Sequence, residues 1–348
     1  MRLIDRIAQC RLPFIVEHQT TKAQSRLSGA ADFATELAAC PIRYVLSDDL
    51  TRLCTAVAYS RGARALACAD LLYIPAERIW VEWCDGPWRA ELAHYGFKRP
   101  NDLEVHGGRR GAYIRAARSG RRGSLRTFWT VGDSDVHILA GSMEAYFDLD
   151  TPEGEEPEPM DGEMRSPMTV SDGEGGDAGV LRRCFRFRYE NSWAHYYDHA
   201  SLTADTRAAV DRHALGTIAI DIPVLLAFFL LLGTRSGLPQ RPVTLERLNR
   251  ARRKVSKPSL LDHIEVFSPL ILSHYPSDRA DTARVRNGPR LHHVRGHLVR
   301  RGSQVFWRVP HLRGSSRSGV IRSRTVTWTF DRGSSVTNAE SAHYAQSV

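Results

Sequence analysis

Apolar residues recur with two different spacings along the chain: the spacing of a helical face in some segments and every second position in others. After Ser47, apolar residues recur at helical spacing over residues 50–58, and Ser47 is a good N-cap for that helix. In RIWVEWC, by contrast, Ile79, Val81 and Trp83 occupy every second position, which is typical of a strand. The pattern therefore predicts a helix followed by a strand.

Further segments downstream have strand-like patterns and are rich in aromatic residues. They are GAYIRAAR, SLRTFWTV, HILAGSMEAYFDLD and CFRFRYE, and most gaps between them have hairpin length. Asp85-Gly86-Pro87 is expected to end the strand RIWVEWC. Short connections favour antiparallel pairing, so we predict an α+β fold: an antiparallel sheet with packed helices and a C-terminal basic β-hairpin module.

The second half of the chain contains its longest apolar run. The run extends from Ile222 to Leu232, and its eleven residues fall short of the roughly 20 that span a bilayer, so we predict a buried core helix. Asp221 is expected to cap this helix and Gly233 to end it. The segment before it is predicted to be helical from about Thr203.

A short, strongly charged helix is predicted after the apolar one. Thr244 is its expected N-cap, and its second half is basic. Its cationic residues are Arg247, Arg250, Arg252, Arg253 and Lys254. We expect this helix to belong to the same α+β domain as the helices before it.

Changes in composition divide the chain into six parts. Residues 151–179 contain nine acids and one base, Arg165, with much Gly and Pro, so they cannot offset their own ordering entropy. This insert is either a solvated linker or a segment that folds back on basic surface. The predicted parts are an N-terminal α+β region (1–150), the acidic disordered insert (151–179), a continuation of the α+β domain with the apolar helix (180–272), a linker (273–289), a basic His/Arg β-rich module (290–331) and a disordered tail (332–348).

Net charge and cysteine content indicate the class of partner and the cellular compartment. The formal net charge of +9 favours anionic partners, with nucleic acid first among them. The six cysteines are scattered without a C-x-x-C pair, which favours a reducing compartment over a disulfide framework or a zinc ribbon. The first residues lack the apolar region of a secretory signal. We therefore expect a soluble, cytoplasmic protein with no cofactor and no membrane partner.

The stretch from Arg290 to Gly314 holds a dense cluster of candidate functional residues. Its 25 residues include four histidines and six arginines, and residues 284–330 have eleven arginines without a lysine, Asp or Glu. HLVRRGSQVFWRV is predicted to form a β-hairpin that turns near residues 301–303. Arginine suits bidentate phosphate contacts, so the segment favours nucleic-acid binding. The arginines expected to contact nucleic acid are Arg290, Arg295, Arg300, Arg301, Arg308 and Arg313.

The histidines of this segment allow two other interpretations. His293 and His297 have the spacing of zinc ligands on a helix, but Gly296 lies between them and no Cys, Asp or Glu is nearby, so we expect no metal site. His292, His297 and His311 are the candidate catalytic residues, because histidine serves as a general base in RNA cleavage. The alternative is that they are hydrogen-bonded structural residues.

A short motif in the same segment resembles a known signature. The residues of the pattern R-x-H-x-x-R-G-H and of the tryptophan-containing strand after it are Arg290, His292, Arg295, Gly296, His297, Trp307 and Pro310. They resemble the C-terminal signature of a family of phage, prophage and plasmid proteins, which is itself distantly similar to a type V-A anti-CRISPR protein. The resemblance implies an origin in a mobile genetic element. It also implies an activity that lowers production of a defence nuclease through its messenger RNA, although Leu298 stands where the anti-CRISPR protein has an aromatic residue.

Three functions are open from the sequence. The first is an accessory protein of a phage or plasmid that binds RNA, or a ribosome-associated complex, and modulates host or defence gene expression. The second is a nuclease, metal-dependent or metal-independent, that uses the C-terminal histidines while arginines clamp phosphate. The third is a structural or assembly protein of a phage particle. We favour the first, in which the chain is not an enzyme and RNA is preferred over DNA.

Overall fold

The chain forms two compact units. The structure, a computed structural model, describes residues 2–9, 30–59, 71–94, 108–131, 137–151, 160–164, 184–190, 194, 202–234, 237–269, 290–294, 297–301, 304–308, 311–313 and 315–320. The first unit contains Met1–Leu272 and Gly296–Val309, and the second contains Ser273–Arg295 and Pro310–Val348. The predicted basic module (290–331) is thus divided between the two units.

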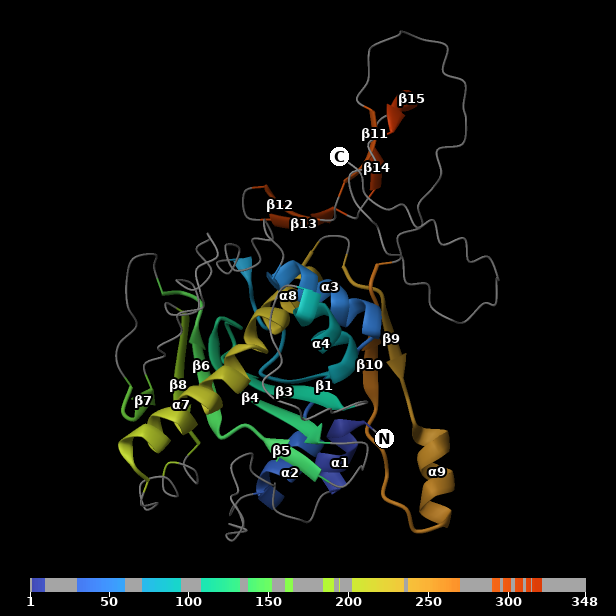
Figure 1. Ribbon diagram of the computed structural model, residues 1–348. Coiled ribbons are helices and arrows are strands. Elements are labelled where there is room, and N and C mark those ends of the chain that lie inside the picture. Colours follow the sequence, from blue (N-terminus) through green and yellow to red (C-terminus); the bar gives the residue numbers. More distant parts are fainter. Residues whose placement is uncertain are drawn as a thin grey trace. The chain divides into compact units, whose positions relative to one another are not determined.

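A ten-stranded mixed sheet is the centre of the first unit (Figure 1). Its strands are β1 (Ile42–Leu46), β2 (Arg78–Cys84), β3 (Arg109–Ala116), β4 (Arg122–Val131), β5 (His137–Ala140), β6 (Met143–Asp148), β7 (Glu163–Met164), β8 (Phe185–Tyr189), β9 (Gln240–Val243) and β10 (His263–Val266). Their order is β7-β8-β6-β4-β3-β2-β1-β10-β9, with β5 also paired to β4. The predicted α+β class is confirmed.

One part of the sheet departs from the antiparallel prediction. β1 runs parallel to both β2 and β10, whereas the other neighbours are antiparallel. The reason is the helix between β1 and β2, α3 (Asp48–Tyr59), which gives the chain the crossover that a parallel pair needs. The predicted β-rich segment HILAGSMEAYFDLD forms two strands, β5 and β6.

Helices cover both faces of this sheet (Figure 1). Besides α3 they are α1 (Leu3–Gln9), α2 (Ala30–Ala38), α4 (Asp85–His94), α7 (Ala204–Ala219) and α8 (Ile222–Leu232). The remaining helix of this unit that the structure describes, α9 (Glu246–Lys254), has no buried residue. Side chains of α3, α4, α7 and α8 form the larger apolar cluster with one face. Side chains of α1 and α2 form the smaller cluster with the other face. The sheet is therefore buried on two sides around its central strands.

Local caps define the starts of α3 and α7. The Leu50 N–H donates to Ser47 Oγ at 3.2 Å, which confirms the predicted cap of α3. Thr203 likewise accepts from the Thr206 N–H at the start of α7. β2 ends at Cys84, so the prediction that Asp85-Gly86-Pro87 ends this strand is confirmed, and these three residues begin α4. Pro87 falls in the first turn, where its missing N–H leaves no hydrogen bond unmade.

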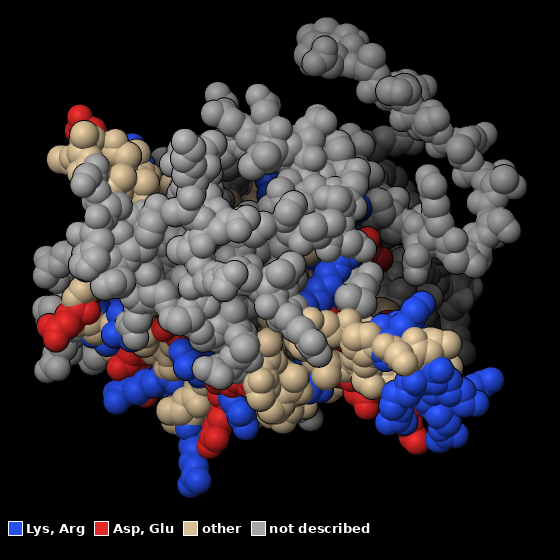
Figure 2. Space-filling view, turned by 90° about the horizontal axis from the view of Figure 1, so that it is seen from below, with Lys and Arg blue, Asp and Glu red and all other residues tan. Residues whose placement is uncertain are grey.

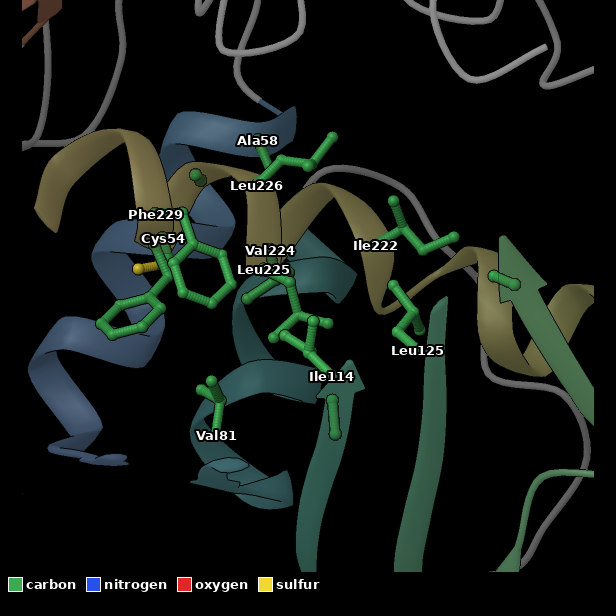
Figure 3. Packing of buried hydrophobic residues seen from close by; sticks show 14 of the residues in the cluster. Cys54, Ala58, Val81, Ile114, Leu125, Ile222, Val224, Leu225, Leu226 and Phe229 are labelled. Atoms are coloured by element: carbon green, nitrogen blue, oxygen red, sulfur yellow. The ribbon is translucent and has the colours of Figure 1, made fainter. Parts of the chain in front are cut away.

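The apolar helix α8 lies in the core, as predicted. Ten of its residues are buried, from Ile222 to Leu231. In Figure 3, Leu225 lies toward Ile114 of the sheet, and Phe229 lies beside Cys54 of α3. Among the described residues, one helical stretch, Ala204–Leu232, is long and apolar enough to cross a membrane, and 78% of its most apolar window is buried in the protein. Burial identifies α8 as a core helix.

Asp221 stands before α8 but does not cap it, so that prediction is wrong. Its carboxylate makes no capping hydrogen bond and instead accepts two from Arg110 of β3. The donor–acceptor distances are 3.0 Å from Nε and 2.7 Å from Nη2. Burial raises the pKa of Asp221, and the Arg110 guanidinium opposes that effect. The pair thus ties the start of α8 directly to the sheet.

Two tryptophans and a second carboxylate surround this pair. The Arg110 guanidinium carbon lies 4.5 Å from the ring centroid of Trp88 and 5.2 Å from that of Trp129. Asp85 Oδ1 lies 3.8 Å from Arg110 Nη1. All these residues are buried, so the charges depend on one another and on the two ring faces rather than on water.

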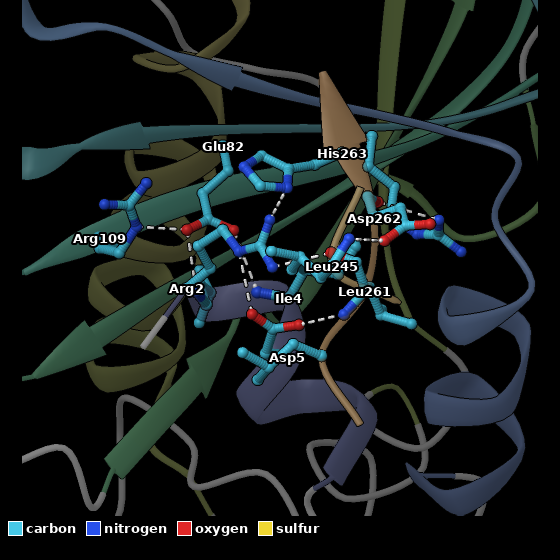
Figure 4. A network of polar contacts seen from close by, with 12 residues as sticks. Arg2, Ile4, Asp5, Glu82, Arg109, Leu245, Leu261, Asp262 and His263 are labelled. Atoms are coloured by element: carbon cyan, nitrogen blue, oxygen red, sulfur yellow. Dashed lines mark hydrogen bonds and ion pairs between the residues drawn. The ribbon is translucent and has the colours of Figure 1, made fainter. Parts of the chain in front are cut away.

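On the opposite face, buried Glu82 holds α1 against the sheet (Figure 4). Its carboxylate accepts from the N–H groups of Leu3 and Ile4, at 2.9 and 3.1 Å, so it satisfies donors that the first turn of a helix leaves open. It also accepts from Trp80 Nε1 at 3.1 Å and pairs with Arg109. A single side chain of β2 therefore anchors α1.

The described part of the acidic insert is not structureless. Residues 163 and 164 form the short strand β7, which pairs antiparallel with β8 at Arg188 and Phe187. The prediction of continuous disorder over 151–179 is wrong at this point, because two residues gain backbone partners at the edge of the sheet. The other residues between 152 and 179 lie outside the described part, apart from the turn that precedes β7.

The C-terminal strands belong to two small sheets. β12 (His297–Arg301) and β13 (Gln304–Arg308) form an antiparallel pair in the first unit. In the second unit, β11 (Arg290–Val294) pairs antiparallel with β14 (His311–Arg313) and parallel with β15 (Ser315–Val320). The predicted linker (273–289) and tail (332–348) lie outside the described residues.

Removing the guanidinium of Arg110 should destabilise the protein strongly. We expect Arg110→Ala to lower the free energy of unfolding by about 3–5 kcal/mol, because it leaves the buried Asp221 without its counter-ion. Urea unfolding followed by tryptophan fluorescence measures this loss. The double variant Arg110→Met, Asp221→Leu should recover much of it, since no buried charge is left unpaired. A loss below about 1 kcal/mol for Arg110→Ala would show that the pair is not needed.

The carboxyl of Glu144 should make stability depend on pH. Burial alone would raise its pKa, but hydrogen bonds from Tyr146, Ser124 and Arg115 outweigh burial and hold the pKa below the ordinary 4.5. A carboxyl with a lower pKa in the folded state stabilises the protein above its unfolded-state pKa, and this contribution is lost as the pH falls through the folded-state pKa.

The test compares Glu144→Gln with the unchanged protein in urea at pH 7 and pH 3. We expect the variant to be the less stable of the two at pH 7 and the difference to shrink at pH 3. Glu77→Gln, at a side chain that is 64% exposed, is the matched control and should change little at either pH. An equal difference at both pH values for Glu144→Gln would contradict the prediction.

Candidate nucleic-acid interface

Helix α9 presents a dense basic surface. None of its nine residues is buried, although strands of the sheet adjoin it on both sides in the sequence. It carries five cationic side chains and one acidic side chain, Glu246. Seen from below the view of Figure 1, a group of Lys and Arg side chains gathers on the side where α9 lies (Figure 2). An exposed helix with this excess of positive charge suits a polyanionic ligand.

The N-terminal end of α9 is capped from a distance. Thr244 is not the N-cap, contrary to the sequence prediction; the cap position is Leu245, whose side chain makes no capping bond. The Leu245 N–H instead donates to Asp262 Oδ1 at 2.7 Å (Figure 4). Glu246 places negative charge in the first turn, where the helix dipole favours it. The cap therefore comes from a residue just before β10.

The C-terminal end of α9 is closed by a Schellman motif. The Lys257 N–H donates to the carbonyl of Arg252 at 3.0 Å, and the Ser256 N–H donates to that of Arg253 at 3.1 Å. Ser256 has a φ of 54°, in the left-handed region that glycine usually occupies in this motif. Arg252, Arg253 and Lys254 in the last turn complement the dipole. Both ends of the basic helix are thus well defined.

A side-chain clasp holds α9 to the segment that follows it. Asn249 Nδ2 donates to the carbonyl of Leu260 and Asn249 Oδ1 accepts from the Leu260 N–H, both at 2.8 Å. Arg252 Nε donates to the carbonyl of Pro258 at 2.7 Å. These bonds use one side of the helix and leave the other sides exposed. The clasp therefore presents the cations on a preorganised element, which lowers the entropy lost on binding.

Most cations of α9 are available to a ligand. Arg250 pairs with Glu246 at 3.1 Å, but both side chains are exposed, and such a pair contributes only about 0.3–0.5 kcal/mol. Arg247, Arg253 and Lys254 have no ion pair with any residue that the structure describes. Phosphate groups would therefore displace little existing structure when they bind to this helix.

The hairpin of β12 and β13 exposes two of the predicted arginines. Arg301 lies opposite Gln304, so two residues connect the strands and the predicted hairpin is confirmed. Arg301 and Arg308 are exposed, whereas Trp307 is half-buried and packs against the main apolar cluster. Residues directly opposite each other share a face, so Arg301 and Arg308 lie on the face away from Trp307, and position 300 is on the Trp307 face.

The remaining predicted residues fall mainly in the second unit. Arg290 and His292 are on β11, and His311 and Arg313 are on β14. The register sets His292 opposite Arg313, and Val294 opposite His311, so these positions share one face of the small sheet. Arg295, Gly296 and Pro310 lie outside the described residues.

The candidate catalytic histidines are divided between the two units. Of the candidate catalytic residues, His297 is in the first unit, whereas His292 and His311 are in the second. Among the described residues no group of three His, Cys, Asp or Glu side chains is placed to hold a metal ion. A cavity of about 20 Å³ between α8 and the sheet is lined only by apolar side chains. Burial raises the pKa of the Cys84 thiol to about 11, which disfavours its thiolate form.

The sequence prediction recognised the charge of α9 but did not include its arginines among the functional residues. A usable signal was present in the pattern of this segment. Five of nine residues are cationic, and only Leu248 and Ala251 are apolar, which is too few for a helix that packs on a core. A helix without a core-facing stripe is held by its caps and exposes its charges.

No protein-family model, no curated protein and no solved structure matches this chain. We therefore base the functional proposal on the residues of α9 and of the β12–β13 hairpin. Both elements belong to the first unit, and both expose arginine to solvent.

Proposed function

We propose that this protein is an accessory protein of a phage or plasmid that binds RNA, or an RNA-containing, ribosome-associated complex, in the cytoplasm and so modulates host or defence gene expression. The observation that carries the RNA-binding part is the preorganised basic helix α9, with five cations and no buried residue. The two caps and the hydrogen bonds of Asn249 fix α9 in place. Its cationic side chains have few ion pairs with the described residues of the domain. Such a surface neutralises phosphate at little cost in ordering.

The C-terminal hairpin supports the same proposal. Arg301 and Arg308 are exposed on the face away from Trp307, and Phe306 between them is half-buried on the same face. Arginine beside an aromatic ring suits phosphate contact combined with base stacking. The origin in a mobile element rests on the motif that begins at Arg290 and its resemblance to phage and plasmid proteins, and remains part of the proposal.

Recovery of bound nucleic acid from the host tests this function. The tagged full-length protein is captured, and the nucleic acid that it retains is sequenced before and after a high-salt wash. A discrete set of RNAs that survives the wash would support a regulator of particular transcripts. Recovery of no nucleic acid, or of a bulk mixture that salt removes completely, would overturn the proposal, because phosphate contacts alone weaken steeply with salt.

Neutralising α9 should weaken binding and reduce its salt dependence. We expect Arg247→Ala, Arg250→Ala, Lys254→Ala to lower affinity for a labelled RNA and to reduce the slope of log K against log salt by about 2, at about 0.7 for each lost phosphate contact on a single strand. Fluorescence anisotropy over a salt series measures both quantities. The triple variant should fold normally, since none of these side chains is buried.

The matched control removes exposed arginines from another place. Arg118 and Arg122 are 95% and 62% exposed and lie at the connection between β3 and β4, away from α9 in the sequence. Arg118→Ala, Arg122→Ala should leave the salt slope unchanged. If this control and the α9 variant weaken binding equally, net charge rather than α9 is responsible.

The hairpin arginines should contribute separately. Arg301→Ala, Arg308→Ala is expected to lower RNA affinity and to reduce the salt slope by about 1.4, because two phosphate contacts are lost. The same anisotropy assay measures the change, and Gln304→Ala, on the same face of the hairpin, is the uncharged control. An unchanged affinity would mean that these arginines are only a solvated face.

A further inference from the structure

Helix α9 exposes an apolar stripe as well as its cations. Leu248 is 47% exposed and Val255, the residue after the helix, is 62% exposed. They are seven residues apart, about two helical turns, so they stand on one side of the helix with exposed Ala251 between them. Phosphate binding does not need this stripe, and among the described residues none covers it enough to bury Leu248 or Val255.

The stripe lies beside a row of three cations, and Arg252, four residues after Leu248, is on its other side. Arg247, Arg250 and Lys254 are three and four residues apart, so they form a row of their own along the helix. At 3.6 residues per turn, this row is about a quarter turn from the stripe, and the clasp of Asn249 takes a different side. A ligand on α9 therefore meets a cationic row and an apolar row side by side.

We infer that α9 binds single-stranded RNA, with phosphates along the row of Arg247, Arg250 and Lys254 and unpaired bases against Leu248, Ala251 and Val255. This inference rests on the proposed function and adds the class of nucleic acid that the helix takes. An unpaired strand has its charged backbone on one edge and the apolar faces of its bases on the other. Its two edges match the two rows of the helix.

A duplex matches this arrangement less well. In an RNA duplex the apolar base faces are stacked inside, the major groove is too deep and narrow for side chains to read, and the shallow minor groove displays 2′-hydroxyls and polar base edges. The apolar row would then face polar or charged groups. Unpaired stretches in cells are chiefly RNA, in loops, bulges and ends, so RNA and not DNA is the committed ligand.

The experiment compares two variants against two probes. The probes are a single-stranded RNA and the same sequence paired with its complement, and the variants of the full chain are Leu248→Ser, Val255→Ser and the cationic triple variant of α9. We expect the apolar variant to lower affinity for the single strand roughly tenfold without changing the salt slope, because apolar contacts release no counterions. Its affinity for the duplex should not change.

Controls separate this inference from the proposed function. Tyr73→Ser, Leu202→Ser removes exposed apolar side chains elsewhere and should leave both affinities unchanged. If the apolar variant binds the single strand like the unchanged protein while the cationic variant is weakened, the inference is overturned and the proposed function stands. If both variants bind the single strand like the unchanged protein, α9 is not the binding surface and the inference is overturned, while the proposed function then rests on the hairpin. If the unchanged protein binds neither probe, both are overturned. Equal binding of single-stranded DNA would overturn the commitment to RNA.

Discussion

The buried ion pair between Arg110 and Asp221 is the constraint on which the arrangement of the first unit depends. A buried charge that loses its partner costs far more than the pair contributes, so the two residues must meet in any well-folded state. Because Asp221 stands immediately before α8 and Arg110 is on β3, their contact decides where the most apolar helix begins on the sheet. The apolar residues of α8 contribute the free energy of burial. They specify the position of α8 on the sheet less sharply than the ion pair does.

Arg109, the residue before Arg110, positions a helix on the other face of the sheet. Successive side chains of a strand point to opposite sides, so Arg109 points toward Glu82 and α1 while Arg110 points toward Asp221 and α8. Each arginine meets a buried carboxylate that belongs to the start of a helix or caps one. Two adjacent residues of β3 therefore locate helices on both sides of the sheet.

Local sequence patterns predicted the helices and strands of this fold better than the long-range contacts between them. The helix after Ser47, the strand RIWVEWC, the buried helix from Ile222 and the hairpin after Gly296 follow from periodicity, caps and turn residues, all of which act over a few positions. The role of Asp221 could not be predicted in this way, because its partner is 111 residues away in sequence. For the same reason Thr244 seemed the natural cap of α9, although Asp262 supplies the cap from beyond the helix.

The site was harder to predict than the fold, because net charge does not show which arginines form ion pairs within the domain and which remain exposed. Many arginines of the first unit meet carboxylates of the domain itself. Such pairs are Arg109–Glu82, Arg110–Asp221, Arg115–Glu144, Arg121–Asp150, Arg207–Asp211 and Arg241–Glu265.

On α9 the balance is different, since five cations share one exposed acid. The helix is attached through its caps and Asn249, and none of its cationic side chains is buried in the core. The exposed side chains of α9 could therefore rearrange around a ligand, while Arg110 and Glu82 stabilise the fold. Because the structural arginines are separate from the exposed ones, the binding of a polyanion to α9, as proposed, would leave the ion pairs that stabilise the fold intact.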